Sequence, residues 1–154
     1  MNDEILGKLQ PAGESDTTLQ TTLTLAASEI SLRIEGHGAP LDSAIALARR
    51  VVAEGRAFDG AARAAAEAKL RSAYNENWRH YTEAGDDGKP HDVDEPELDE
   101  QEFMSRMRLV TVTISGSSRC EFIYDDDGMF WGHSIHVRFP EAPSRADAHV
   151  DLAG

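Results

Sequence analysis

The sequence predicts an α+β fold in which an antiparallel sheet packs against two long helices and one short helix. Apolar and polar residues alternate over 17–35 and again over 110–139, as they do in strands with one buried face. Between these regions, residues 41–81 carry apolar side chains at helical spacing. Strands at both ends of a helical middle are typical of the α+β class.

Length and composition indicate one domain. A chain of 154 residues, of which 40% are hydrophobic, is long enough to bury a single core of ordinary size. Residues 1–16 include Pro11 and Gly13 and show no sustained periodicity, so we expect them to form a loosely ordered N-terminal arm. Residues 17–154 are predicted to form the single α+β domain.

The first two strands are predicted at 17–26 and 29–35. Leucines of one parity recur in the first segment, and isoleucine and leucine alternate with polar residues in the second. The positions that should face the core are Leu19, Leu23, Leu25, Ile30, Leu32 and Ile34. The pattern indicates a strand pair with one solvated face.

Two long helices are predicted to follow. The first ends at Gly55, since glycine commonly terminates a helix. The second begins near Asp59, a residue type that caps helices, and runs toward Trp78 or Tyr81. The side chains expected to face inward are Leu41, Ala44, Ile45, Ala48, Val52, Ala62, Ala66, Leu70 and Ala73.

A short third helix is predicted to begin at Asp99. Asp99 and Glu102 have the spacing of a capping box, in which each side chain accepts a hydrogen bond from the backbone of the other residue. This helix would bury Phe103 and Met107.

In the last third of the chain, the alternating pattern predicts an antiparallel meander of three strands. A short edge strand at 150–152 could form the fourth. One turn is expected at 116–118, and a two-residue turn is expected at Asp127–Gly128. The resulting pairs are Ile114 with Cys120, Val112 with Phe122, Val110 with Tyr124, Tyr124 with Trp131, Phe122 with His133, and Cys120 with Ile135. This register would bury Trp131 on the inner face.

The charge is strongly negative and localised. The net charge is -13, and the segment 83–102 contains ten acids and one base, Lys89, so it carries -9 of that total. Such a balance argues against nucleic acid or an anionic membrane as a partner. We expect an acidic loop at 84–97, with a basic protein as the partner of these binding candidates: Asp86, Asp87, Asp92, Asp94, Glu95 and Glu97.

The remaining composition favours a cytoplasmic protein. The N terminus lacks the basic and apolar regions of a secretory signal, and no apolar run has the length of a membrane span. Cys120 is the single cysteine, so an internal disulfide is impossible. We expect no cofactor, and nothing in the sequence indicates an oligomeric state.

Residues 132–136, GHSIH, contain residue types found in active sites. The segment lacks the fifth-position glycine of a nucleophile elbow, and neighbours such as His133 and Ser134 point to opposite faces of a strand. For the same reason His133 and His136 should not hold one metal ion. The catalytic candidates that stay open are His133, His136, Ser134 and Glu121, although a structural role in the core is favoured for His133.

A metal site in the acidic segment is not favoured either. His80, His91, Asp92 and Asp94 offer suitable donors, but their spacing is not diagnostic of any cation site. We therefore expect no metal ion.

Residues 103–135 resemble a bacterial family described as domain of unknown function 2262. The matching residues are Phe103, Asp126, Phe130, Trp131, Gly132, His133, Ser134 and Ile135. The resemblance extends to the two N-terminal strands and the helical middle, so it covers most of the chain beyond the arm. It implies an α+β fold and a bacterial source, and it provides no catalytic residue.

Three function classes stay open, and the least specific is a structural or oligomerising subunit, which an edge strand and an exposed apolar patch would support. The favoured one is a non-enzymatic module whose acidic segment docks on a basic protein; an immunity protein that neutralises a cationic toxin would have this charge. The alternative is a small hydrolase-like enzyme in which His133 or His136 acts as acid or base, with Glu121 or Asp126 as the orienting carboxylate.

Overall fold

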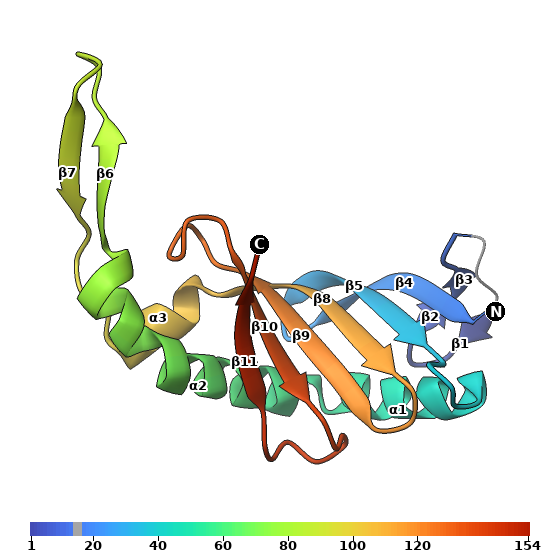
Figure 1. Ribbon diagram of the computed structural model, residues 1–154. Coiled ribbons are helices and arrows are strands. Elements are labelled where there is room, and N and C mark those ends of the chain that lie inside the picture. Colours follow the sequence, from blue (N-terminus) through green and yellow to red (C-terminus); the bar gives the residue numbers. More distant parts are fainter. Residues whose placement is uncertain (14–16) are drawn as a thin grey trace.

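The computed structural model describes residues 1–13 and 17–154, and its main feature is a seven-stranded sheet with helices along one face (Figure 1). The strands are β3 (Gln10–Pro11), β4 (Thr18–Leu25), β5 (Ser28–Glu35), β8 (Arg108–Ser115), β9 (Arg119–Asp125), β10 (Ser134–Phe139) and β11 (His149–Ala153). Their spatial order is β11-β10-β9-β8-β5-β4-β3. The α+β class, the N-terminal strand pair and the C-terminal edge strand are confirmed.

The two predicted groups of strands join into one sheet through a parallel pair. Leu32 lies opposite Val112, and Ile34 lies opposite Ile114. The expectation of an entirely antiparallel sheet is therefore wrong at β5 and β8. Parallel neighbours cannot be joined by a tight turn, so the whole helical middle of the chain serves as their connection.

Three α-helices and one π-helical turn make up this connection among the described residues. They are α1 (Leu41–Ala53), α2 (Gly55–Ala73), η1 (Tyr74–Trp78) and α3 (Glu100–Arg106). α1 and α2 run one after the other along one face of the sheet (Figure 1). The π-helical turn arises where the N–H of Arg79 donates to the carbonyl of Tyr74, five residues earlier.

The second helix begins at Gly55 and not near Asp59. A Cβ atom at position 55 would lie 2.8 Å from Cγ of Leu25, so glycine allows the helix to start in close contact with β4. Asp59 lies inside the helix, where its carboxylate accepts a hydrogen bond from the Tyr124 hydroxyl at 2.6 Å and pairs with Arg63 at 3.0 Å. Its role is tertiary and not that of a cap.

The core lies between the two long helices and the sheet. The ring of Phe58, from α2, packs 5.9 Å from Phe122 and 5.3 Å from Phe139, centroid to centroid. Most inward positions expected on the helices are buried, as are those expected on β5. The buried ones are Ala44, Ile45, Ala48, Ala62, Ala66, Leu70, Ile30, Leu32 and Ile34.

The short helix forms as predicted. Asp99 accepts a hydrogen bond from the N–H of Glu102 at 2.8 Å, and the Glu102 carboxylate accepts one from the N–H of Asp99 at 3.1 Å. Phe103 and Met107 are buried. The capping box predicted from sequence is therefore confirmed.

The N-terminal segment contributes to the fold. Residues 1–13 contain β1 (Asn2–Asp3), β2 (Gly7–Lys8) and β3, and β3 extends the main sheet beside β4. Leu6 and Leu9 are buried in the core, which explains why this part of the predicted loose arm is packed. The rest of the predicted arm, residues 14–16, lies outside the described residues.

The C-terminal meander has the expected faces and a different register. Across the first turn, Ile114 pairs with Cys120 and Val112 with Phe122, as predicted, but a bulge after Leu109 brings Leu109 opposite Tyr124 in place of Val110. Across the second, Cys120 pairs with Phe139 and not with Ile135. This shift of four residues is even, so Ile135, Val137 and Phe139 stay on the inner face. Leu109 replaces Val110 there, and Trp131 and His133 precede the strand.

The second turn is wider than predicted. Asp127 and Gly128 have positive φ values of 50° and 79°, as a tight turn requires, but β10 begins only at Ser134. Trp131 therefore belongs to a loop, residues 126–133, and is 58% exposed. The prediction that it is buried opposite Tyr124 is wrong.

The acidic segment forms a hairpin where a loop was predicted. Its strands are β6 (His80–Ala84) and β7 (Pro90–Asp94), which pair with each other in a separate two-stranded sheet. Only the turn 85–89 and residues 95–99 lack regular structure. No helix in the described parts of the chain is long and apolar enough to cross a membrane.

Substitution of Gly55 tests the close contact between α2 and β4. Gly55→Ala should lower the free energy of unfolding by about 1–3 kcal/mol, because the new methyl group overlaps the buried side chain of Leu25. A Cβ atom at Gly60, in the same helix, would have no neighbour within 4 Å, so Gly60→Ala should raise the free energy of unfolding by about 0.5–1 kcal/mol. Urea unfolding of both variants measures the difference; equal stabilisation by both would contradict the contact.

Cys120 should be inert in the native protein. Its side chain is fully buried, and burial raises the pKa of the thiol to about 12, so the reactive thiolate is scarce. A thiol-specific reagent at pH 8 should modify the protein only after it is unfolded in guanidinium chloride. Rapid modification of the folded protein would refute this prediction.

Candidate functional site

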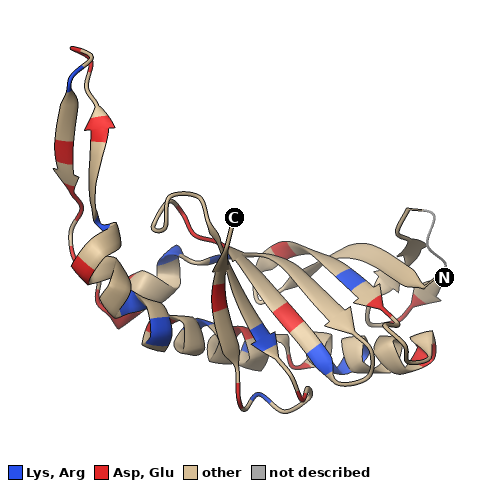
Figure 2. Ribbon diagram, in the orientation of Figure 1, with Lys and Arg blue, Asp and Glu red and all other residues tan. Residues whose placement is uncertain are grey.

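The β6–β7 hairpin projects from the end of the helical layer, away from the main sheet (Figure 1). Acidic residues are distributed along it and at its tip, where Lys89 is the basic neighbour (Figure 2). All six binding candidates lie on the hairpin, its turn or the residues after it, and five of them are exposed. The hairpin therefore presents its charge to solvent on an element separate from the core.

Cross-strand contacts stabilise the hairpin. His80 pairs with Asp94 through a hydrogen bond from its ring, and the hydroxyl of Thr82 donates to Asp92 at 3.1 Å. Near the tip, Nε2 of His91 lies 3.0 Å from Oδ1 of Asp87. Such pairs are the units that stabilise an antiparallel ribbon.

The root of the hairpin is fastened to the end of η1. The guanidinium of Arg79 donates to the carbonyl of Asn75 at 2.8 Å and to that of Glu95 at 2.9 Å. The Asn75 amide exchanges two hydrogen bonds with the backbone of Leu98. Both strands of the hairpin are thus tied to the same turn of helix.

Two carboxyl groups of the hairpin are held in the charged form by their partners. The hydrogen bond with His91, together with the N–H of Lys89, lowers the pKa of Asp87 below its usual value. The hydrogen bond with His80 lowers the pKa of Asp94 in the same way. These positions keep their negative charge to a lower pH than an isolated aspartate would.

The loop 126–133 lies near the root of the hairpin and is organised by one buried carboxylate. Asp126 is 1% exposed and accepts backbone hydrogen bonds from Gly128, Phe130 and Gly132 at 2.8–3.1 Å. Three donors on one carboxylate fix the loop in a single conformation.

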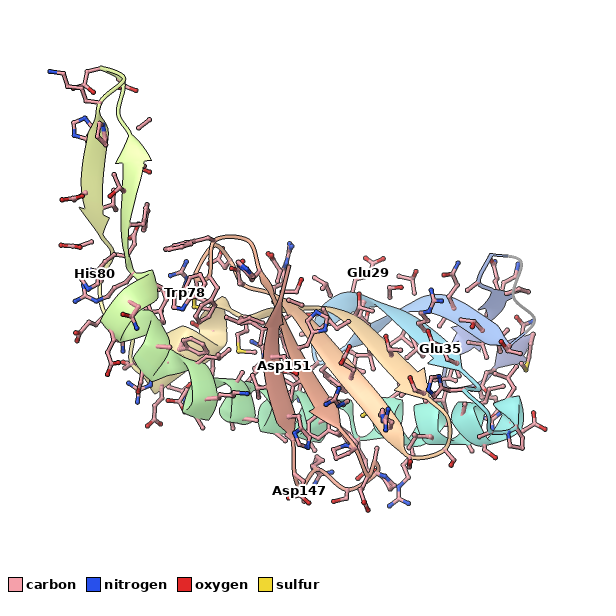
Figure 3. The ribbon with its side chains drawn as sticks, in the orientation of Figure 1. Glu29, Glu35, Trp78, His80, Asp147 and Asp151 are labelled. Atoms are coloured by element: carbon pink, nitrogen blue, oxygen red, sulfur yellow. The ribbon has the colours of Figure 1, made fainter. Side chains whose placement is uncertain are left out.

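Trp131 is the exposed member of this loop. Its indole N–H donates to the carbonyl of Trp78 at 3.2 Å, and the two indole rings are 4.6 Å apart. Its φ of 58° is unusual for a bulky side chain. Trp78, at the end of η1, and His80, at the start of β6, mark the base of the hairpin (Figure 3).

Trp131 and the hairpin border an open, solvent-facing cavity of about 300 Å³ lined by Tyr81, Thr82 and Trp131. We call this cavity the aromatic notch. The Tyr81 hydroxyl donates to the Glu95 carboxylate at 2.9 Å, a bond that raises the pKa of Tyr81. The notch therefore combines aromatic walls with nearby negative charge.

His133 lies in the loop and not in the middle of a strand. Its ring bonds to the carbonyl of Phe130 and packs edge-on against Trp78 at 5.7 Å, so it supports the loop and the hairpin root. Among the described residues, Ser134 makes no side-chain hydrogen bond. The structure does not bring His133 and Ser134 together as a nucleophile and its base.

His136 and Glu121 are the two catalytic candidates that do meet. His136 Nδ1 lies 3.2 Å from Oε1 of Glu121, and both side chains are half-buried on the sheet face opposite the helices. A histidine oriented by a carboxylate can transfer protons. The same pair also serves as an ordinary cross-strand contact.

The donors in the acidic hairpin are dispersed. His80 pairs with Asp94 at the base of the ribbon, whereas His91 pairs with Asp87 near its tip. Within residues 1–13 and 17–154, no three His, Cys, Asp or Glu side chains are grouped closely enough to hold a metal ion.

A family model described as "Uncharacterized protein conserved in bacteria (DUF2262)" matches residues 3–150. The chain belongs to this family. The resemblance of residues 103–135 is thus confirmed and extends over nearly the whole chain, including the acidic hairpin. Comparisons with curated proteins and with solved structures find no match.

The aromatic notch was not predicted from sequence. The strand pattern placed Trp131 on an inner face, and the helical spacing placed Trp78 and Tyr81 in a longer second helix. A signal was present: glycines 128 and 132 bracket GMFWG, and both have positive φ. Two glycines four residues apart favour a loop over a continuous strand.

Substitution of Asp126 should release the loop 126–133. Asp126→Ala leaves three backbone N–H groups without their acceptor, so the free energy of unfolding should fall by about 2–3 kcal/mol. Asp126→Asn should lower the free energy of unfolding by less, because the amide oxygen still accepts a hydrogen bond in place of one carboxylate oxygen. The control is Asp127→Asn, which breaks an exposed ion pair with Arg106. Its free energy of unfolding should stay within about 0.5 kcal/mol of the parent value. Urea unfolding that finds Asp127→Asn less stable than Asp126→Ala would contradict this assignment.

Proposed function

We propose that this member of the DUF2262 family is a non-enzymatic protein-binding module that docks its acidic hairpin on a basic protein surface. One observation carries the proposal: the acidic binding candidates lie on or next to a ribbon that is separate from the core. This ribbon projects beyond the helical layer and contributes no strand to the main sheet. A ribbon in this position can enter a partner's surface without disturbing the core.

The electrostatics support a basic partner. A concentrated patch of one sign increases the association rate with a surface of opposite sign and suppresses binding to like-charged surfaces. The root contacts of Arg79 and Asn75 fix the ribbon before binding, which lowers the entropy cost of docking. An immunity protein that covers a cationic toxin is one form of such a module, and a bacterial family is compatible with it.

Charge removal on the hairpin tests the proposal. One variant replaces the six binding candidates, Asp86, Asp87, Asp92, Asp94, Glu95 and Glu97, by their amides. A matched control removes six exposed acids elsewhere: Glu4, Glu29, Asp42, Glu141, Asp147 and Asp151. Both variants have the same net charge, so only the position of the lost charge differs.

Each protein serves as bait in a bacterial lysate at low and at high ionic strength. The parent and the control variant should recover the same basic protein at low ionic strength, and the hairpin variant should recover at least about tenfold less because steering and contact charges are lost. High ionic strength should release the partner. The proposal is rejected when no basic protein binds, or when the two variants recover it equally.

The His136–Glu121 pair supports a second candidate, an enzyme in which His136 acts as acid or base and Glu121 orients its ring. Glu121→Gln keeps the shape of the side chain and removes its charge, so a hydrolase of this kind should lose about 10²-fold or more of its turnover. Screening of ester and phosphoester substrates with parent and variant separates the two classes, since docking by the hairpin is insensitive to Glu121→Gln.

A further inference from the structure

We propose that the aromatic notch is an anchor pocket for an arginine side chain of the basic partner. This inference rests on the proposed docking of the acidic hairpin, and it names the chemical group that the partner inserts. The notch lies at the root of the hairpin, between Trp131 of the loop 126–133 and Tyr81 and Thr82 of β6. A partner that lies along the hairpin therefore reaches it without leaving the ribbon.

The first step is that Trp131 is exposed and yet held in place. Its side chain makes a hydrogen bond and a ring contact with Trp78. Its backbone is also restrained, because the N–H groups of the residues on either side, Phe130 and Gly132, both donate to the Asp126 carboxylate. An aromatic side chain that is already immobilised loses little entropy when it is covered. Exposed and rigid aromatic residues of this kind are typical anchors of protein interfaces.

The second step is the charge at the wall of the notch. The hydroxyl of Tyr81 is bound to the carboxylate of Glu95, and that of Thr82 to the carboxylate of Asp92. Successive residues of a strand point to opposite faces, so the carboxylate on the Tyr81 side of the ribbon is that of Glu95. This environment favours a cation over a neutral apolar side chain.

The third step distinguishes arginine from lysine. The planar guanidinium stacks on an aromatic ring while its N–H groups donate to carboxylates at its edge, whereas the lysine ammonium is a strongly hydrated point charge. The notch, of about 300 Å³, is lined by the aromatic side chains of Trp131 and Tyr81 together with Thr82, and the Glu95 carboxylate lies at its edge, bound to the Tyr81 hydroxyl. Arginine uses both features at once.

Three peptides test the inference: acetyl-Lys-Gly-Lys-X-Lys-Gly-Lys-amide with Arg, Lys or Leu at X. The Arg and Lys peptides have the same charge, so their ratio of dissociation constants isolates the guanidinium. The parent protein should bind the Arg peptide about fivefold more tightly than the Lys peptide. Fluorescence anisotropy of labelled peptides at low ionic strength measures each constant.

Trp131→Ala should reduce this preference to less than about twofold, and Trp131→Phe should keep part of it, because a smaller ring still provides a face. Tyr81→Leu provides a second variant on the opposite wall. Ile5→Ala, which shortens an exposed apolar side chain at the far end of the molecule, is the matched control and should keep the full preference. Thermal unfolding of each variant verifies that it is folded.

Equal binding of the Arg and Lys peptides to the parent overturns the inference, and so does tighter binding of the Leu peptide, which would indicate an apolar occupant. An unchanged preference in both Trp131→Ala and Tyr81→Leu overturns it as well. The amide variant of the hairpin distinguishes the two proposals. If all three peptides bind this variant as tightly as the parent, the docking function fails; if the variant binds all three more weakly but the parent binds the Arg and Lys peptides equally, only the anchor fails.

Discussion

Strand β8 lies parallel to β5, and a parallel neighbour is reached only by a connection that crosses a face of the sheet. Residues 36–107 make this connection, and α1 and α2 use it to cover the apolar face (Figure 1). α2 and η1 continue past the edge of the sheet, so the chain must reverse direction beyond it. The β6–β7 hairpin occupies this point of reversal, and α3 brings the chain back to β8.

The hairpin root and the loop 126–133 are far apart in sequence but meet through two tryptophans. Trp78 is the last residue of η1, and Trp131 is the exposed residue of the loop. The indole N–H of Trp131 donates a hydrogen bond to the carbonyl of Trp78. The ring of Phe130, buried next to Trp131 in the loop, packs against Trp78 at 5.4 Å, which joins this contact to the core. The orientation of the hairpin relative to the sheet is therefore linked to the packing beneath it.

The sequence predicted the features that depend on local periodicity. Residue faces in β5, β9, β10 and most of β8 were correct, because alternation along a strand does not depend on its partner; the exception is Val110, where a bulge brings Leu109 to the inner face. The capping box of Asp99 and Glu102 was correct because its two residues are three positions apart. For the same reason the bend at Asp127 and Gly128 was found, although the strands do not pair next to it.

The errors concern contacts that no periodic pattern reports, some within the loop 126–133 and some between distant residues. Asp126 binds three N–H groups of its own loop, and this competition delays the start of β10, which no alternation pattern reports. The hairpin was predicted as a loop since its composition is poor in strand formers, and its stabilising pairs, such as His80 with Asp94, span 14 positions. The notch depends on both of these features, so its residues could not be assembled from sequence.

The free edges of the β6–β7 ribbon carry a further consequence for solubility. Both outer edges of a two-stranded ribbon present backbone groups that could pair with a strand of another molecule, which is the usual route to edge-to-edge aggregation. Carboxylates along this ribbon repel the identical ribbon of a second copy, so the same side chains oppose edge-to-edge pairing. The histidine partners lower the pKa of Asp87 and of Asp94, so this repulsion extends further into acid at these two positions than isolated aspartates would allow.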